Sequence, residues 1–365
     1  MYIRHPYLVL ICVVCVIIGG IIGWFRPTPA FISVSPQQIT SYRGALLRQS
    51  SIAYDFINPL LACNVGSEEA FPEFASLRES LTSIVNKKTA IGDAKDISIY
   101  LRSLVSARWF EVNGEFTYAP ASLFKTFVMM AYYKEANETD NPKLLQEKIP
   151  FKGSATYGDD VVGGTIPHLA NGKLYTIDEI IDQMITYSDN DALNTLIYNF
   201  DTDTLSRFET IFKDLNIPLP LTTNDTDMGF MSAVDYSMVF RVLYGSTYLS
   251  ERYSEKALQL LSQAKYKDGI VAGIPSNLVV AHKYGVLTEP KTATTTESTQ
   301  LHDCGIVYYP NHPYLLCIMT RGDDLAKQQR SISDISSVAY KWLDAYYKSL
   351  PSSAATTTTP STVTP

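Results

Sequence analysis

Strand-like segments occur in two groups at opposite ends of the chain's body, with a long helical block between them. Alternating apolar residues run through 97–118, and again through 277–287 and 303–322. From Ser122 to about Lys265, helical periodicity dominates. If the two groups form one sheet, the helical block is an insertion within it. The sequence therefore predicts an α+β fold, an antiparallel sheet flanked by helices with an inserted all-α subdomain at about 120–265.

The composition is that of a folded domain. The chain has 365 residues, of which 46% are hydrophobic, enough for a proper core. Its net charge is −7, and its lysines and arginines form no run. Nucleic acid is normally bound by a clustered basic face, so we expect a protein that does not bind nucleic acid, and we expect a monomer.

The N-terminus suggests a membrane anchor. The segment Pro6–Phe25 is uncharged and rich in Leu, Val and Ile, and it is long enough to span a bilayer. We expect an uncleaved transmembrane anchor at 1–26, a polar stalk at 27–50 and a body at 51–350 outside the cytoplasm. The Ser/Thr/Pro-rich tail at 351–365 has nothing to bury, and we expect it to be disordered.

Cysteines and histidines give weaker signals. Cys304 and Cys317 flank the turn "YYPNHPY" and can face each other across a hairpin, where a disulfide is one possibility. The five histidines are scattered, without the spacing of a metal site. His282, His302 and Cys304 are better explained as satisfied sheet residues, so we expect no metal and no other cofactor.

A serine and a lysine three residues apart open the helical block, in "APASLFKTF". On a first helical turn Ser122 and Lys125 share one face, where the amine can reach the hydroxyl and act as its base. The pattern alone is weak, because a serine near a helix start is also ordinary capping chemistry. A second copy, Ser262 with Lys265, lies in a polar helical segment where no function is expected.

Two further motifs follow in the chain. Ser188, Asp189 and Asn190 lie between two helical stretches, where a second hydroxyl can pass a proton and an amide can bind a substrate amide. Helix capping is the competing interpretation of this tripeptide. Lys283 stands in an apolar strand, and Gly285 two residues later lets the substrate lie close against the strand and use its backbone N–H groups. An exposed strand lysine is the competing interpretation of Lys283.

Together the three motifs, in this order, resemble the class A β-lactamases and penicillin-binding proteins, serine hydrolases with Ser-x-x-Lys, Ser-Asp-Asn and Lys-Thr-Gly. The resemblance implies that Ser122 is the acylated nucleophile and Lys125 its base or proton relay. Ser188 would protonate the leaving nitrogen, Asn190 would bind the acyl side-chain amide, and Lys283 would attract a substrate carboxylate. The implied substrate is a β-lactam or the D-Ala-D-Ala stem peptide of peptidoglycan.

The resemblance also places an oxyanion between the backbone N–H groups of Ser122 and Val286. It departs at two positions. Tyr284 stands where the family has threonine or serine, so a bulky phenol replaces the hydroxyl that meets the carboxylate. Phe212, in "FKDLN", stands where the β-lactamases have a glutamate that activates the deacylating water. Asp225 and Asp227 are alternative bases, although acidic residues in such a turn are usually solvated.

These departures leave three functions open. The first is a class A β-lactamase-like hydrolase working through an acyl-Ser122 intermediate with slow deacylation. The second is a D,D-peptidase of the penicillin-binding type that acts on stem peptides. The third is a penicillin sensor or cell-wall-binding protein without turnover.

Overall fold

A computed structural model of the chain describes residues 55–57, 72–153, 168–200, 204–218, 229–289 and 298–350. All of them belong to one compact unit, Leu47–Pro365. The predicted anchor, stalk and tail lie outside the described residues. Among the helices within the described ranges, none is long and apolar enough to cross a membrane.

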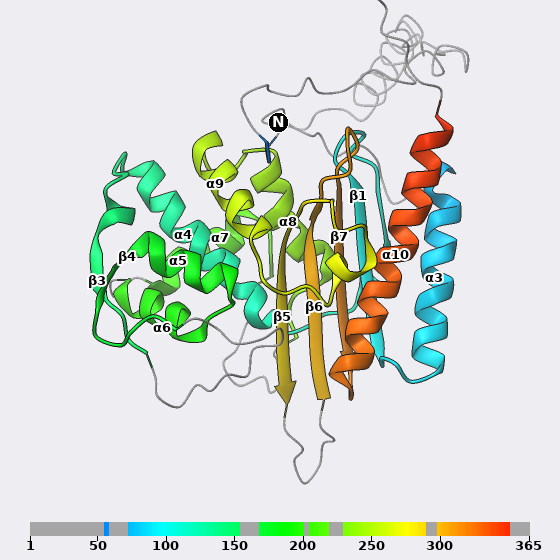
Figure 1. Cartoon of the computed structure of the whole chain (residues 1–365), viewed down its shortest axis with the longest axis horizontal. Coiled ribbons are helices and arrows are strands. Elements are labelled where there is room, and N and C mark those ends of the chain that lie inside the picture. Colours follow the sequence, from blue (N-terminus) through cyan, green and yellow to red (C-terminus); the bar gives the residue numbers. More distant parts are fainter. Residues whose placement is uncertain are drawn as a thin grey trace, which may run out of the picture. The chain divides into compact units, whose positions relative to one another are not determined.

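Five strands form one antiparallel sheet in the order β2-β1-β7-β6-β5 (Figure 1). They are β1 (Asp96–Ser103), β2 (Trp109–Val112), β5 (Val280–Glu289), β6 (Ser298–Val307) and β7 (Tyr314–Gly322). The first two come from the beginning of the body and the last three from its end. The predicted meeting of the two strand groups in one sheet is confirmed, and β5 forms an edge.

Helices cover both faces of the sheet (Figure 1). They are α3 (Ala75–Ala90), α4 (Lys125–Glu138), α5 (Ile177–Thr186), α6 (Asn190–Asn199), α7 (Thr204–Asp214), α8 (Ala233–Tyr244), α9 (Glu251–Ser262) and α10 (Leu325–Ser349). Helices α3 and α10 pack on one face, while α8 and α9 carry the inserted block against the other. The α+β fold with an inserted helical subdomain is thus confirmed.

The inserted block also contains a two-stranded antiparallel sheet that the sequence did not predict. Its strands are β3 (Lys148–Pro150) and β4 (Leu174–Thr176). Each strand has three residues, and their side chains are exposed or half-buried, so they leave no readable alternation. The expectation that the inserted block is all-α is therefore wrong, because the block contains this small sheet.

Two hydrophobic cores follow from the layers. On α3, Leu77, Leu81 and Val85 repeat every fourth residue and are buried against the sheet, as an amphipathic helix requires. This core continues onto α10. The larger core lies between the other face of the sheet and the helical block, and Phe127 and Met129 of α4 are buried in it. The candidate residue Lys125 lies on α4 in this second layer, whereas Tyr284 belongs to the first core.

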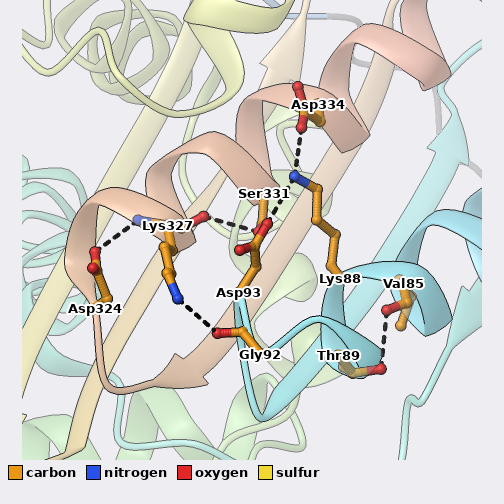
Figure 2. A network of polar contacts seen from close by, with 9 residues as sticks. All are labelled: Val85, Lys88, Thr89, Gly92, Asp93, Asp324, Lys327, Ser331 and Asp334. Atoms are coloured by element: carbon orange, nitrogen blue, oxygen red, sulfur yellow. Dashed lines mark hydrogen bonds and ion pairs between the residues drawn. The ribbon is translucent and has the colours of Figure 1, made fainter.

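The end of α3 is tied to the beginning of α10 by polar contacts (Figure 2). The Lys88 ammonium is 3.2 Å from the Asp93 carboxylate and 2.6 Å from that of Asp334. Lys327 donates to the Gly92 carbonyl at 3.4 Å. Burial lowers the pKa of Lys88, but the two carboxylates outweigh this and hold it above its usual value. These contacts therefore hold α3 and α10, the two helices of the outer layer, against each other.

A disulfide joins the neighbouring strands β6 and β7. Cys304 and Cys317 are paired in the strand register and bonded to each other, and both are fully buried. The possibility raised by the hairpin is thus realised. In the same row, Lys283 of β5 is the register partner of Cys304. The cross-link therefore lies directly beside the strand that carries a candidate site residue.

We expect the double variant Cys304→Ala/Cys317→Ala to lose about 2–3 kcal/mol of unfolding free energy, because the bond closes a short loop in the unfolded chain. Guanidinium unfolding followed by fluorescence measures this loss. Reductant should move the wild-type transition to that of the variant and leave the variant unchanged. Equal transitions for the variant and the oxidised wild type would contradict a stabilising role.

Candidate active site

Ser122 lies in a short 3-10 turn, η3 (Ala121–Phe124), that runs directly into α4. Ala121, the residue before it, has a φ of 48°, in the left-handed region that non-glycine residues rarely adopt. Lys125 is fully buried, and its Nζ donates to Ser122 Oγ at 2.9 Å. The strained backbone of Ala121 thus comes directly before the serine that lies beside the Lys125 amine.

The turn is held in place by the sheet. The N–H of Ala119 donates to Gln300 Oε1 at 3.0 Å, and the carbonyl of Ala119 accepts from His302 Nε2 at 2.9 Å. Burial lowers the pKa of His302 to about 4, so the imidazole is neutral and donates through Nε2. Gly285 completes the contact, because a Cβ there would lie 3.0 Å from the carbonyl of Pro120. Its lack of a side chain therefore serves the approach of β5 to η3.

Ser188 lies in the short connection between α5 and α6. Its φ is 60°, again in the left-handed region. The next residue, Asp189, caps α6 by accepting from the N–H groups of Asp191 at 2.7 Å and Ala192 at 3.1 Å, and it also accepts from Gln183 at 2.9 Å. The middle residue of the Ser-Asp-Asn motif is therefore a buried helix cap.

Lys125 joins the first two motifs. Besides Ser122, its Nζ contacts the Ser188 carbonyl at 2.6 Å, Ser188 Oγ at 3.3 Å and Asn190 Oδ1 at 2.6 Å. Burial lowers its pKa to about 7, although the Asp189 carboxylate acts in the opposite direction. An amine with this pKa is partly unprotonated at neutral pH and can accept a proton.

Lys283 joins the third motif to the same serine. Its Nζ donates to Ser188 Oγ at 2.8 Å and to the carbonyl of Tyr284 at 2.8 Å, and it is fully buried. Burial, followed by the nearby charge of Lys125, holds the pKa of Lys283 well below its usual value. Ser188 Oγ is thus flanked by two buried amines.

Tyr284, predicted to be the first departure from the family pattern, lies on the edge strand β5. Its ring stacks on that of Tyr266 at 4.1 Å between centroids, and only 6% of the residue is exposed. Burial raises the pKa of its phenol to about 12, partly offset by a side-chain hydrogen bond with Ser188. Val286, two residues on, is half-buried.

Phe212, predicted to be the second departure, is buried in α7. Its ring lies 4.7 Å from that of Phe127 and 6.5 Å from that of Phe124, which flank Lys125 in the sequence. The position is therefore apolar and packed against the helix that begins after Ser122. The alternative bases Asp225 and Asp227 lie outside the described residues.

The structure thus brings together Ser122, Lys125, Ser188, Asn190, Lys283 and Tyr284, the predicted site residues whose side chains contact one another. In the second Ser-x-x-Lys copy, by contrast, the Ser262 hydroxyl donates to the carbonyl of Gln259. Sequence reasoning missed the roles of Tyr266, Gln300 and His302, which belong to no motif.

The histidines considered as metal ligands have other partners. His282 Nδ1 lies 2.8 Å from Asp303 Oδ1, His302 contacts the Ala119 carbonyl and Cys304 is in the disulfide. Among the residues that the structure describes, no group of three His, Cys, Asp or Glu side chains could hold a metal ion.

A known protein family matches most of the chain. The chain matches the model of the family described as "Beta-lactamase enzyme family" over residues 76–343, which is most of its length. The chain belongs to this family. No curated protein matches.

Solved structures of β-lactamase type share the fold. The acyl-enzyme complex of a PBP-A mutant with penicillin G is 20% identical, with a TM-score of 0.58 over 74% of this chain and 97% of that one. A class A β-lactamase representative from Bacteroides cellulosilyticus is 18% identical, with a TM-score of 0.60 over 73% and 98%. A β-lactamase from Sphaerobacter thermophilus is 19% identical, with a TM-score of 0.57 over 72% and 95%.

The geometry of the site predicts that the rate of Ser122 acylation depends on pH. If Lys125 is the base of Ser122, it can take up the serine proton only when its amine is unprotonated. The rate of Ser122 acylation should then fall about tenfold per pH unit below the Lys125 pKa of about 7 and level off above it. Acetylation by p-nitrophenyl acetate, followed by mass spectrometry of the peptide that contains Ser122, measures this rate.

Lys125→Arg is the control, because a guanidinium stays protonated and cannot act as the base. We expect it to slow acetylation of Ser122 about 10²–10⁴-fold at pH 8. A wild-type rate that does not change between about pH 5.5 and 8.5, on either side of the Lys125 pKa, would contradict the role of Lys125.

Proposed function

We propose that the chain is a serine hydrolase of the class A β-lactamase type that opens an amide bond through an acyl-Ser122 intermediate. One observation carries the proposal, the continuous chain of short contacts from Ser122 Oγ through Lys125 Nζ and Ser188 Oγ to Lys283 Nζ. Such a chain can take a proton from a nucleophile and deliver one to a leaving group.

The proposed acylation begins at Ser122. Unprotonated Lys125 takes the hydroxyl proton while Oγ attacks the carbonyl carbon, and the negative oxygen is stabilised by the N–H groups of Ser122 and Val286. The C–N bond then breaks, and the departing nitrogen receives the proton of the Ser188 hydroxyl. Lys125 returns its proton to Ser188, so the enzyme ends as a neutral acyl-Ser122 ester. Asn190 binds the amide of the acyl side chain.

Slow deacylation is part of the proposal. Phe212 occupies the sequence position of the β-lactamase glutamate, and its side chain is buried among aromatic rings. A phenyl group cannot activate a water molecule. The same observation favours the second candidate, a D,D-peptidase of the penicillin-binding type on stem peptides. A sensor that acylates once is the limiting case.

The location of the protein is also a proposal. The apolar segment 6–25 supports a membrane anchor, and the Cys304–Cys317 disulfide supports an oxidising compartment outside the cytoplasm. Both are consistent with a substrate in the cell envelope, either a β-lactam or a peptidoglycan stem peptide.

The test is covalent labelling of the full chain by three acyl donors: a fluorescent penicillin, a chromogenic cephalosporin and the methyl ester of N-benzoylglycyl thioglycolate. With any donor that reacts, we expect a burst of about one equivalent per enzyme, followed by slow turnover, because the acyl-enzyme accumulates. Intact-mass spectrometry identifies the adduct, and stopped-flow absorbance measures the burst.

Ser122→Ala should abolish both adduct and burst. Fast, linear turnover without an accumulated adduct would assign an efficient β-lactamase and overturn the slow-deacylation part. A wild-type protein that none of the three donors acylates would overturn the catalytic function as a whole.

A further inference from the structure

The amine of Lys283 is already occupied within the protein. It donates to Ser188 Oγ and to the Tyr284 carbonyl, each at 2.8 Å, and it lies 4.4 Å from the centroid of the Tyr284 ring. The side chain is fully buried. A substrate carboxylate that approached this amine would have to displace one of these contacts without solvent to compensate for the loss.

The Tyr284 side chain covers the amine. Successive side chains of a strand point to opposite faces, yet the Lys283 amine lies over the Tyr284 ring, 4.4 Å from its centroid, at the strand that ends the sheet. The stack on Tyr266 and the contact with the Lys283 ammonium hold the ring in this place. A threonine in the same position would leave this volume open.

A buried carboxylate lies on the neighbouring strand. Asp303 of β6 is the register partner of Tyr284 and is fully buried, where it accepts from the N–H of Ile270 at 2.8 Å and pairs with His282 Nδ1 at 2.8 Å. Gly269 makes room for it, since a Cβ there would lie 2.2 Å from Asp303 Oδ2. The charge of Asp303 already acts on Lys283, where it favours the ammonium form.

We propose, on the basis of the acyl-Ser122 function above, that Tyr284 closes the Lys283 position to a carboxylate and selects acyl donors whose departing group is neutral beside the scissile bond. The substrate class is then an amide or ester that continues into an uncharged or amidated group, rather than one ending in a free acid. In the reaction the Ser122 Oγ–C bond forms, the bond to the departing heteroatom breaks, and Ser188 protonates that atom.

The experiment compares two donors that differ in one charge, N-benzoylglycyl thioglycolate and its methyl ester, with release of the thiol as the readout. Each kcat/KM is divided by the rate of the same thioester with hydroxide, which removes the difference in intrinsic reactivity. For the wild type we expect the neutral ester to be preferred at least about tenfold, because the free acid brings an unpaired charge to a closed site.

Two variants separate the ring from the hydroxyl. Tyr284→Thr opens the position, and we expect it to shift the acid-to-ester ratio toward the acid by at least about tenfold. Tyr284→Phe keeps the ring and removes only the hydroxyl, so the acid-to-ester ratio should stay at the wild-type value. Circular dichroism checks the fold of both variants. If Tyr284→Thr does not fold, the acid-to-ester ratio of the wild type alone tests the inference.

A wild type that prefers the free acid would overturn the inference and assign the carboxylate to Lys283 or to the exposed Lys265 and Lys267. A folded Tyr284→Thr with the wild-type ratio would overturn it as well. Failure of the proposed function has a different result. In that case the wild type would release thiol from neither thioester faster than Ser122→Ala does.

Discussion

The site depends on two lysine amines buried on either side of one serine hydroxyl. Burial disfavours the charged form of an amine, and two positive charges so close to each other repel, so the arrangement is costly unless hydrogen bonds offset it. Lys125 and Lys283 obtain these bonds from Ser188, Asn190 and a backbone carbonyl. The same burial gives Lys125 a pKa of about 7, where it can act as a base.

The fold supplies the positions from three separate elements. Lys125 comes from the start of α4, Ser188 from the connection between α5 and α6, and Lys283 from the sheet edge. What brings them into register is the close approach of β5 to the turn before α4, where Gly285 lies against the Pro120 carbonyl and Gln300 and His302 hold Ala119. Ala121 and Ser188, on either side of Lys125, both have strained backbones, as is common where function fixes a conformation.

The sequence was informative where the relevant contacts are local. The pairing of Ser122 with Lys125 follows from helical spacing, and the layers follow from the order of the periodic segments. The joining of Ser188 and Lys283 came from the family resemblance, because no periodicity relates residues so far apart. The Tyr266–Tyr284 stack and the contacts of Gln300 and His302 were missed, since they join ordinary residue types across elements. Gly285 was predicted to let the substrate approach the strand closely. In the structure it is the backbone of the turn before α4 that lies close to Gly285.

The register row that contains Lys283, Cys304 and Cys317 has a consequence for the maturation of the protein. Both cysteines are fully buried within the larger core, beneath the helical block. A dissolved oxidant or an oxidoreductase can reach them only while that block is still away from the sheet. We therefore expect the bond to form before the layers close, while both thiols on the strands next to Lys283 are still accessible.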